Sequence, residues 1–450
     1  ACRYSMRSAA IAALMLLMLF IQLFPTATGE NDMAGYWLEK TRELYDNELY
    51  EMSLRYINKS LDADPQNASA WSSKGDILGQ LGQYGESLKA YDRALGIDPR
   101  NADALFGRGN ILYFLGRYEE SLQSFDTALD TEPGFTWAWN NRGVTLSDLG
   151  RYEEAIQSYD RAIDNDPHYS GAWNNKGMAY YQMGRYQDAI SSFDRAIEIK
   201  PDHVTVLANK GQALDKLGRY EEAIKCYDEA LWINPREAIA WYGKGMAIYN
   251  MGYIEESIDF YDRAISLNPR IAEVWCNKGL SHFSSGDSEE ALRCYDEAIK
   301  IKPRLAMAWQ LKGLALQKLA KYNESAQSFK EATRIEPLNK DVWFNQGISL
   351  SKAGRQEEAL IALNRTVAIN PKYAQAWSYR GVVLNLLHRY DEAVKSFEEA
   401  IALNPEDPVP WHGKGYALQG LGRNTEASKA FSEASFLEAY RMDPFANSGF

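Results

Sequence analysis

Apolar residues recur at helical spacing along this chain, and the pattern is clearest in residues 136–169. Apolar side chains recur in two runs, at positions 139, 144, 146 and 149 and at positions 152, 155, 156, 159, 162 and 163, the second run with intervals of three and four. This spacing places them on one face of an amphipathic α-helix, whereas a strand would alternate. Gly150 lies between the runs, where the first helix needs a left-handed end, and Pro167 ends the second helix. The segment therefore predicts two helices joined by a tight turn.

The same two runs recur with a fixed period. Prolines occur every 34 residues from Pro65 to Pro405, and a large apolar residue, mostly Trp, follows each by six positions. A glycine stands four positions further on, from Gly75 to Gly415. One helix pair cannot bury its apolar face alone, so copies must stack and share a core.

Twelve copies of this unit tile residues 34–441 without an insertion. Residues 30–33 are expected to be a short linker, and residues 442–450 a tail. The last helix continues past the usual stop, which favours a cap on the final copy, although docking of a second molecule stays open. The expected bounds of the copies are 34–67, 68–101, 102–135, 136–169, 170–203, 204–237, 238–271, 272–305, 306–339, 340–373, 374–407 and 408–441.

Residues 1–29 differ from the rest of the chain. Two arginines precede a 16-residue apolar run, residues 9–24, and small residues follow it. This order is typical of a signal peptide, with cleavage after Gly29. An uncleaved membrane tether through residues 9–24 is the alternative, although a bilayer span needs roughly 20 residues. Both interpretations place the remaining chain outside the cytoplasm, secreted or anchored to the outer face of the cytoplasmic membrane.

The residues that recur in each copy resemble a known repeat. Counted from the first residue of a copy, the fixed positions are 4, 8, 11, 20, 24, 27 and 32. In residues 136–169 they are Trp139, Gly143, Leu146, Ala155, Tyr159, Ala162 and Pro167. This set strongly resembles the tetratricopeptide repeat. The resemblance implies an all-α fold, a right-handed superhelical α-solenoid, whose first helices line a concave groove that binds proteins or extended peptides.

Positions 7 and 25 depart from that family. Position 7 is basic in most copies and position 25 is acidic in most of the same copies, as in Arg142 and Asp160. We expect the two to pair across the hairpin within each copy, each pair contributing about 0.2–1 kcal/mol. The alternative is a basic ladder that binds an acidic ligand. Lys312 and Lys330, both in copy 306–339, break the rule.

The resemblance places positions 2, 5, 9, 12 and 13 in the groove, with position 6 beside them. These positions vary between copies, as expected of a binding site on a fixed scaffold. Asparagine recurs at position 6, where its amide could bond the backbone of an extended peptide, or instead neighbouring helix ends or water. The predicted peptide-binding residues are Phe106, Asn110, Tyr113, Phe114, Trp137, Asn140, Asn141, Asn174, Asn175, Met178, Tyr181, Asn209, Tyr242, Met246, Tyr249, Asn277 and Phe283.

Composition and the absence of known motifs argue against nucleic-acid binding and against catalysis. A net charge of −12 and a pI near 5.2 disfavour nucleic acid as a partner. No nucleophile, phosphate-loop or zinc motif occurs, so we predict no catalytic residue, no cofactor and no metal site. Cys276 and Cys294 are expected to be free thiols, although a disulfide within their hairpin is conceivable.

The leading hypothesis is therefore a non-enzymatic scaffold that binds protein or peptide segments outside the cytoplasm. Two alternatives stay open. One is a structural component of a surface assembly that self-associates through the C-terminal helix. The other is a non-catalytic subunit of an enzyme complex, such as a glycosyltransferase.

Overall fold

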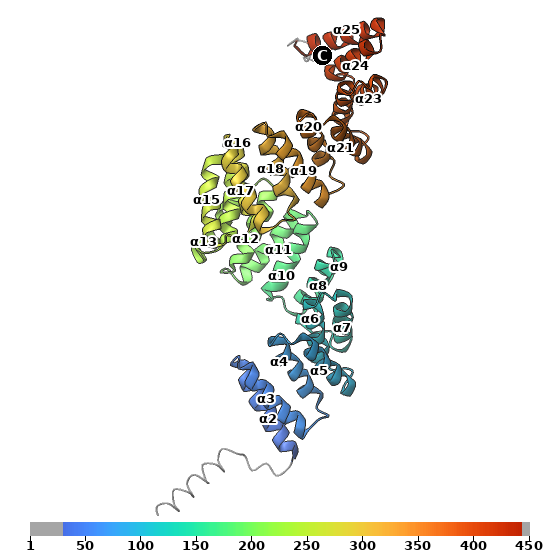
Figure 1. Ribbon diagram of the computed structural model, residues 1–450. Coiled ribbons are helices and arrows are strands. Elements are labelled where there is room, and N and C mark those ends of the chain that lie inside the picture. Colours follow the sequence, from blue (N-terminus) through green and yellow to red (C-terminus); the bar gives the residue numbers. More distant parts are fainter. Residues whose placement is uncertain (1–29, 443–450) are drawn as a thin grey trace, which may run out of the picture. The chain divides into compact units, whose positions relative to one another are not determined.

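The computed structural model describes residues 30–442, which form 24 α-helices and no strand (Figure 1). The predicted all-α fold of paired helices is thereby confirmed. Residues 30–33, expected to be a linker, are instead the first turn of α2 (Glu30–Asp46). The predicted signal peptide or anchor lies outside the described residues. Within residues 30–442, no helix is both long and apolar enough to cross a bilayer.

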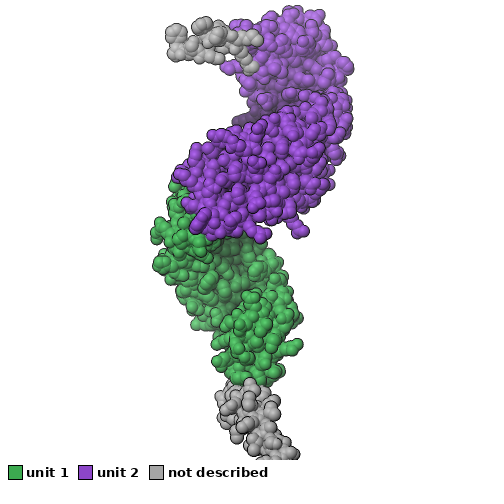
Figure 2. Space-filling view, turned by 90° about the vertical axis from the view of Figure 1, so that its left-hand side faces the viewer, with its two compact units in different colours: residues 1–217 green, residues 218–450 purple. Residues whose placement is uncertain are grey.

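The chain divides into two compact units, residues 1–217 and residues 218–450 (Figure 2). The helices of unit 1 are α2, α3 (Tyr50–Ala63), α4 (Ala68–Gln80), α5 (Tyr84–Ile97), α6 (Ala102–Phe114), α7 (Tyr118–Thr131), α8 (Thr136–Asp148), α9 (Tyr152–Asn165), α10 (Ser170–Gln182), α11 (Tyr186–Ile199) and α12 (Val204–Lys216). Those of unit 2 are α13 (Tyr220–Ile233), α14 (Ala238–Asn250), α15 (Ile254–Leu267), α16 (Ala272–Ser285), α17 (Ser288–Ile301), α18 (Ala306–Lys318), α19 (Tyr322–Ile335), α20 (Lys340–Lys352), α21 (Gln356–Ile369), α22 (Ala374–Leu386), α23 (Tyr390–Leu403), α24 (Pro408–Gly420) and α25 (Asn424–Met442).

Within each unit, the first and second helices of a copy pack side by side, as α8 and α9 do in unit 1 and α14 and α15 in unit 2 (Figure 1). Gly150 has a φ of 75° and ends α8, so the predicted left-handed turn is confirmed. Within each unit the second helix also packs against the first helix of the next copy, as α7 does against α8. First helices of successive copies touch as well, as α4 and α6 do. The first helices of each unit therefore share one face, which carries the predicted groove positions.

The fixed positions build the shared core. Tyr159, at position 24, is fully buried between the helices of its copy. A Cβ atom added to Gly143 would lie 2.5 Å from the Tyr159 ring, closer than side chains approach. Trp139 donates its indole N–H to the carbonyl oxygen of Pro133 at 2.8 Å, and other copies repeat this bond. This bond explains why a tryptophan stands six residues after the proline, where one copy joins the next.

The ion pairs at positions 7 and 25 join neighbouring copies, so the expectation that they form within one copy is wrong. The side chain of Arg142 contacts Asp126, 16 residues earlier, at 2.6 Å. Asp160, the expected partner, instead contacts Lys176 of the next copy at 2.6 Å. Arg142 also donates to the hydroxyl of Ser158 at 2.7 Å, so one guanidinium links three helices.

This register explains the copy that seemed to break the rule. Lys312 contacts Asp296 of the preceding copy at 2.6 Å. Position 7 of the next copy, which should pair with Lys330, is the uncharged Gln346, and both residues line one small cavity. The Arg142 side chain is 22% exposed and that of Asp126 53%, so the basic group is the more covered partner. The paired bases are therefore part of the scaffold and do not form an open ladder for an acidic ligand.

A double-mutant cycle distinguishes the two registers. Arg142→Gln combined with Asp126→Asn should give a coupling of about 0.5–1 kcal/mol in urea unfolding, because each single change removes the same contact. Arg142→Gln combined with Asp160→Asn is the matched control and should give a coupling near zero. Coupling to Asp160 but not to Asp126 would contradict the register.

Candidate functional site

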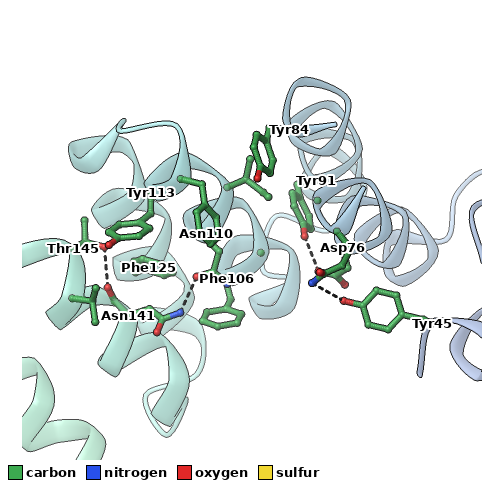
Figure 3. Close-up of a pocket in the computed structure, with 16 residues that line it drawn as sticks. Tyr45, Asp76, Tyr84, Tyr91, Phe106, Asn110, Tyr113, Phe125, Asn141 and Thr145 are labelled. Atoms are coloured by element: carbon green, nitrogen blue, oxygen red, sulfur yellow. Dashed lines mark hydrogen bonds between the residues drawn. The ribbon is translucent and has the colours of Figure 1, made fainter. Parts of the chain in front are cut away.

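The predicted groove residues of unit 1 lie on the first helices α6, α8, α10 and α12, and part of them line one cavity. This cavity has a volume of about 500 Å³, and its walls come from α2 and the next three copies (Figure 3). Five predicted residues contribute to it: Phe106, Asn110, Tyr113, Phe114 and Asn141. The residues that were not predicted are Tyr45, Asp76, Gly79, Gln80, Tyr84, Tyr91, Gly107, Ile111, Phe125, Val144 and Thr145.

Aromatic rings form much of the cavity wall. Phe114 is 68% exposed, and its ring stacks on that of Tyr84 with the centroids 6.3 Å apart. Phe106 packs more deeply, against Phe125 at 6.0 Å. Tyr113 donates its hydroxyl to Asp148 on α8 at 2.6 Å, and this bond is the first cause that raises the pKa of Tyr113 to about 12. The rings are thus held in place by contacts within the protein and still present surface to a ligand.

The asparagines of the first helices bond to one another. Six of them, which we call the amide chain, connect α12 to α6 through five hydrogen bonds in one direction. The bonds run from Asn209 Nδ2 to Asn174 Oδ1 (3.0 Å), Asn174 Nδ2 to Asn175 Oδ1 (3.3 Å), Asn175 Nδ2 to Asn140 Oδ1 (3.0 Å), Asn140 Nδ2 to Asn141 Oδ1 (3.0 Å) and Asn141 Nδ2 to Asn110 Oδ1 (2.9 Å). The neighbours of these amides are therefore mainly other amides, an arrangement that the sequence did not predict.

Asp76 is the one charged residue of the cavity wall, and sequence reasoning missed it. It lies on α4, and Figure 3 shows the Tyr91 side chain of α5 pointing at it. The Tyr91 hydroxyl donates to Asp76 Oδ1 at 2.6 Å. Surrounding protein atoms raise the pKa of Asp76 to about 6, the Tyr91 bond opposes this, and the charge of Asp103 adds to it. An available signal was that Asp76 occupies position 9 of its copy, one of the expected groove positions.

Other predicted residues of unit 1 lie outside this cavity. Asn175 and Met178 line a second cavity of about 320 Å³ between α8 and α10. Trp137 is 57% exposed, with its ring 4.9 Å from that of Tyr169. Tyr181 packs against a neighbouring tyrosine ring at 5.4 Å. These side chains extend the aromatic surface beyond the first cavity.

The predicted residues of unit 2 lie on α14 and α16. Asn277 donates to the hydroxyl of Tyr242 at 2.7 Å, and the Tyr249 hydroxyl lies 3.0 Å from that of Ser284. Met246 packs against a core cluster, and Phe283 lies beneath the ammonium group of Lys318 at 4.7 Å. All of these side chains contact neighbouring helices of unit 2.

Cys276 and Cys294 of unit 2 are free and buried. The expectation of unpaired thiols at Cys276 and Cys294 is confirmed, and the alternative of a disulfide between them is wrong. Burial raises the pKa of Cys276 to about 12 and that of Cys294 to about 11, so both remain protonated and unreactive near neutral pH.

Three side chains of α16 and α17 come close enough to be considered as metal ligands. The ligand atoms of His282, Glu290 and Cys294 all lie within 4.8 Å of one another. Glu290 already pairs with Arg293 at 2.7 Å, and metals bind the thiolate form that burial disfavours at Cys294. We therefore assign no metal site to this cluster.

The described solenoid is similar to several solved structures. A tetratricopeptide repeat protein from Parabacteroides merdae ATCC 43184 is 19% identical, with a TM-score of 0.49 over 55% of this chain and 98% of that chain. YrrB, described as a tetratricopeptide repeat protein with an unusual peptide-binding site, is 24% identical, with a TM-score of 0.33 over 42% and 96%. The APC/C hetero-tetramer Cut9–Hcn1 is 12% identical, with a TM-score of 0.39 over 92% and 95%. No curated protein matches the chain.

Three family models described as the tetratricopeptide repeat match the sequence itself. The first matches residues 38–102, 73–134, 140–204 and 310–374, the second 204–237, 272–305 and 374–407, and the third 238–271. Membership of this family supports a role as a scaffold for protein–protein interaction. Because the matched segments span more than half of the sequence, the chain belongs to the tetratricopeptide repeat family.

Proposed function

We propose that this protein is a non-enzymatic scaffold that binds a segment of another protein along the first helices of unit 1. The observation that carries the proposal is the aromatic cavity, which gathers residues from separate copies, among them Tyr84, Phe114 and Asn141. A cavity of about 500 Å³ is large enough for side chains of a bound segment. Aromatic side chains favour binding because they bury a large area at modest entropic cost.

The amide chain suits the backbone of such a segment. An asparagine amide carries two N–H groups and two acceptor lone pairs. The bonds between the asparagines use one N–H of each donor and one lone pair of each acceptor. On the partly exposed members of the amide chain, such as Asn141 and Asn175, the second N–H and lone pair can serve a peptide group. Because neighbouring amides hold the first bonds, the orientation of each side chain is fixed before a ligand arrives.

Binding through this face can be tested by removing its aromatic surface. The combined change Tyr113→Ala, Phe114→Ala and Trp137→Ala should lower the affinity for a selected peptide or co-purified partner by tenfold, an estimate of about 1.4 kcal/mol, because exposed aromatic contact area is lost. Calorimetry or fluorescence polarisation measures the change. Trp232→Ala, which removes an 87% exposed ring from α13 of unit 2, is the control. Undiminished binding by the triple variant would exclude this face.

The proposal also places the protein outside the cytoplasm. Its support is the order of charged, apolar and small residues in the first 29 positions. Protease treatment of intact cells provides the test. Digestion of the chain while a cytoplasmic marker survives is the expected outcome, and full protection until lysis would contradict the location.

Self-association is a second candidate, favoured by the length of α25. This helix has 19 residues, whereas the second helices of the other copies have 14, and it carries Phe436 with 63% exposure. Sedimentation velocity over a range of concentrations should then report an oligomer that Phe436→Ser weakens. A monomer at every concentration would rule out this function.

A further inference from the structure

The cavity of unit 1 has a negative group and no positive one. Among its lining residues only Asp76 is charged, and none is Lys, Arg or His. Its Oδ1 atom accepts the Tyr91 hydroxyl at 2.6 Å, and the charge that most affects it is another carboxylate, Asp103. Within residues 30–442, Asp76 takes part in no ion pair. A carboxylate in this setting lacks a counter-ion.

The same sign of charge extends along the neighbouring groove positions. In copies 68–101, 102–135 and 136–169, positions 2, 5, 6, 9, 12 and 13 contain Asp76, Asp103 and Asp148 and no basic residue. Basic residues of these copies occur instead at positions such as 7, where Arg142 is paired with Asp126. The field at the cavity is therefore negative, which attracts a cation.

Aromatic rings surround the space beside the carboxylate. Tyr45, Tyr84 and Phe106 line the cavity with Asp76 (Figure 3). Phe114 lines it as well. Ring faces carry negative electrostatic potential, so they attract ammonium and guanidinium groups within about 6 Å. They also pack against the aliphatic stem of a long basic side chain. Rings and a carboxylate together favour a cation over a neutral or anionic group.

Close packing fixes the carboxylate and the hydroxyl that holds it. Gly107 of α6 lies against Tyr91, and a Cβ atom there would be 2.5 Å from the tyrosine oxygen. Any larger residue would displace the hydroxyl that donates to Asp76. The acceptor atom is therefore preorganised by contacts among α4, α5 and α6.

From this arrangement we infer that the cavity takes a Lys or Arg side chain of the bound protein segment, with Asp76 as its counter-ion and the aromatic rings as its walls. The inference rests on the proposed function and adds the chemistry of one contact. A basic residue of the bound segment would therefore act as its anchor in the groove of unit 1. The cavity exceeds one side chain in volume, so residues beside the anchor also find space.

Affinity should depend on pH through Asp76. Although Asp76 is partly exposed to solvent, the surrounding protein raises the pKa of its carboxyl to about 6. A bound cation favours the ionised form, so affinity is full above this value and declines as the pH falls through it. Among the described residues, the titratable groups that interact with Asp76 are Tyr45 of α2, Tyr91 of α5 and Asp103 of α6. The pKa of each tyrosine is raised by burial, so both phenols stay neutral over this range.

A peptide selection followed by a double-mutant cycle tests the inference. Random peptides displayed on phage are selected for binding to the full chain. The affinity of a selected peptide is then measured twice, once for the original peptide and once for the peptide with its basic residue replaced by norleucine. The replacement should lower affinity for the unaltered protein by about tenfold and affinity for Asp76→Asn by less than about twofold. Asparagine keeps an acceptor for Tyr91, so the variant retains the fold.

Asp130→Asn is the matched control, since it removes the same charge from an exposed site on α7 outside the cavity. With Asp130→Asn, the norleucine replacement should still lower the affinity of the peptide by about tenfold. Lowering the pH from about 8 to about 5 should weaken binding to the unaltered protein and to Asp130→Asn, but not to Asp76→Asn. Selected peptides without a basic residue, or an equal effect of norleucine on both proteins, would overturn the basic-anchor site while groove binding stands. Binders that are insensitive to the triple aromatic variant, or no binder at all, would instead count against the proposed function.

Discussion

Replacing Phe193 by alanine should lower the free energy of unfolding of unit 1 by about 3–5 kcal/mol, the largest single effect that we expect. Phe193 occupies position 24 of its copy and is fully buried in α11. Its ring lies so close to Gly177 that a Cβ atom there would be 2.6 Å away. The helices are held apart by their other contacts, so the vacated space cannot close fully, and transfer and cavity costs add.

Urea unfolding followed by circular dichroism measures this loss, and hydrogen exchange locates it. In a solenoid each copy is stabilised mainly by its neighbours, so amides of α10 to α12 should lose protection more than those of α2 to α4. Trp232→Ala is the matched control because its ring is 87% exposed, and it should change stability by less than about 0.5 kcal/mol. A loss below about 1 kcal/mol at Phe193 would contradict the packing described.

Breaking the amide chain should give the next largest effect. Asn175→Leu should destabilise unit 1 by about 2 kcal/mol, because it leaves the acceptor of Asn140 and the donor of Asn174 without their partner. Asn140 is only 5% exposed, so water replaces the lost bond poorly. Chemical unfolding of the purified chain measures the loss.

Asn345→Leu is the control at the same repeat position. Its amide bonds the carbonyl of Asp341 within its own helix at 2.9 Å and does not belong to the amide chain. A loss of less than about 0.5 kcal/mol is expected there. If both substitutions lowered the free energy of unfolding equally, the amide chain would not stabilise unit 1 beyond an ordinary asparagine contact.

Most of the scaffold was predictable because its determinants are local. The spacing of apolar residues set both helices, Gly150 set the turn between them, and Pro167 set the end of the copy. The need for a small residue at Gly143 also followed from the pattern, and the ring of Tyr159 explains it. These features depend on a few neighbouring residues, which the sequence displays directly.

The binding face was predictable only in part. Position numbers identified Phe106, Tyr113 and Phe114 as residues of one face, and the cavity contains all three. Asp76 was missed because a single acidic residue in an acidic chain carries no periodic signal. Its significance comes from the Tyr91 hydroxyl and the rings beside it, which belong to other helices.

The sequence by itself determined the period, the helix pairs and the buried positions, because one repeat length and one helical periodicity admit a single solution. It did not determine whether the ion pairs of positions 7 and 25 form within one copy or between neighbouring copies. In a chain of period 34, a residue at position 7 has a position-25 residue both 18 positions ahead and 16 positions behind, so Arg142 could face Asp160 or Asp126. Only the packing of α8 against α7 selects Asp126. The same register places Lys330 beside the neutral Gln346 of the next copy, which explains why copy 306–339 has a basic residue at position 25.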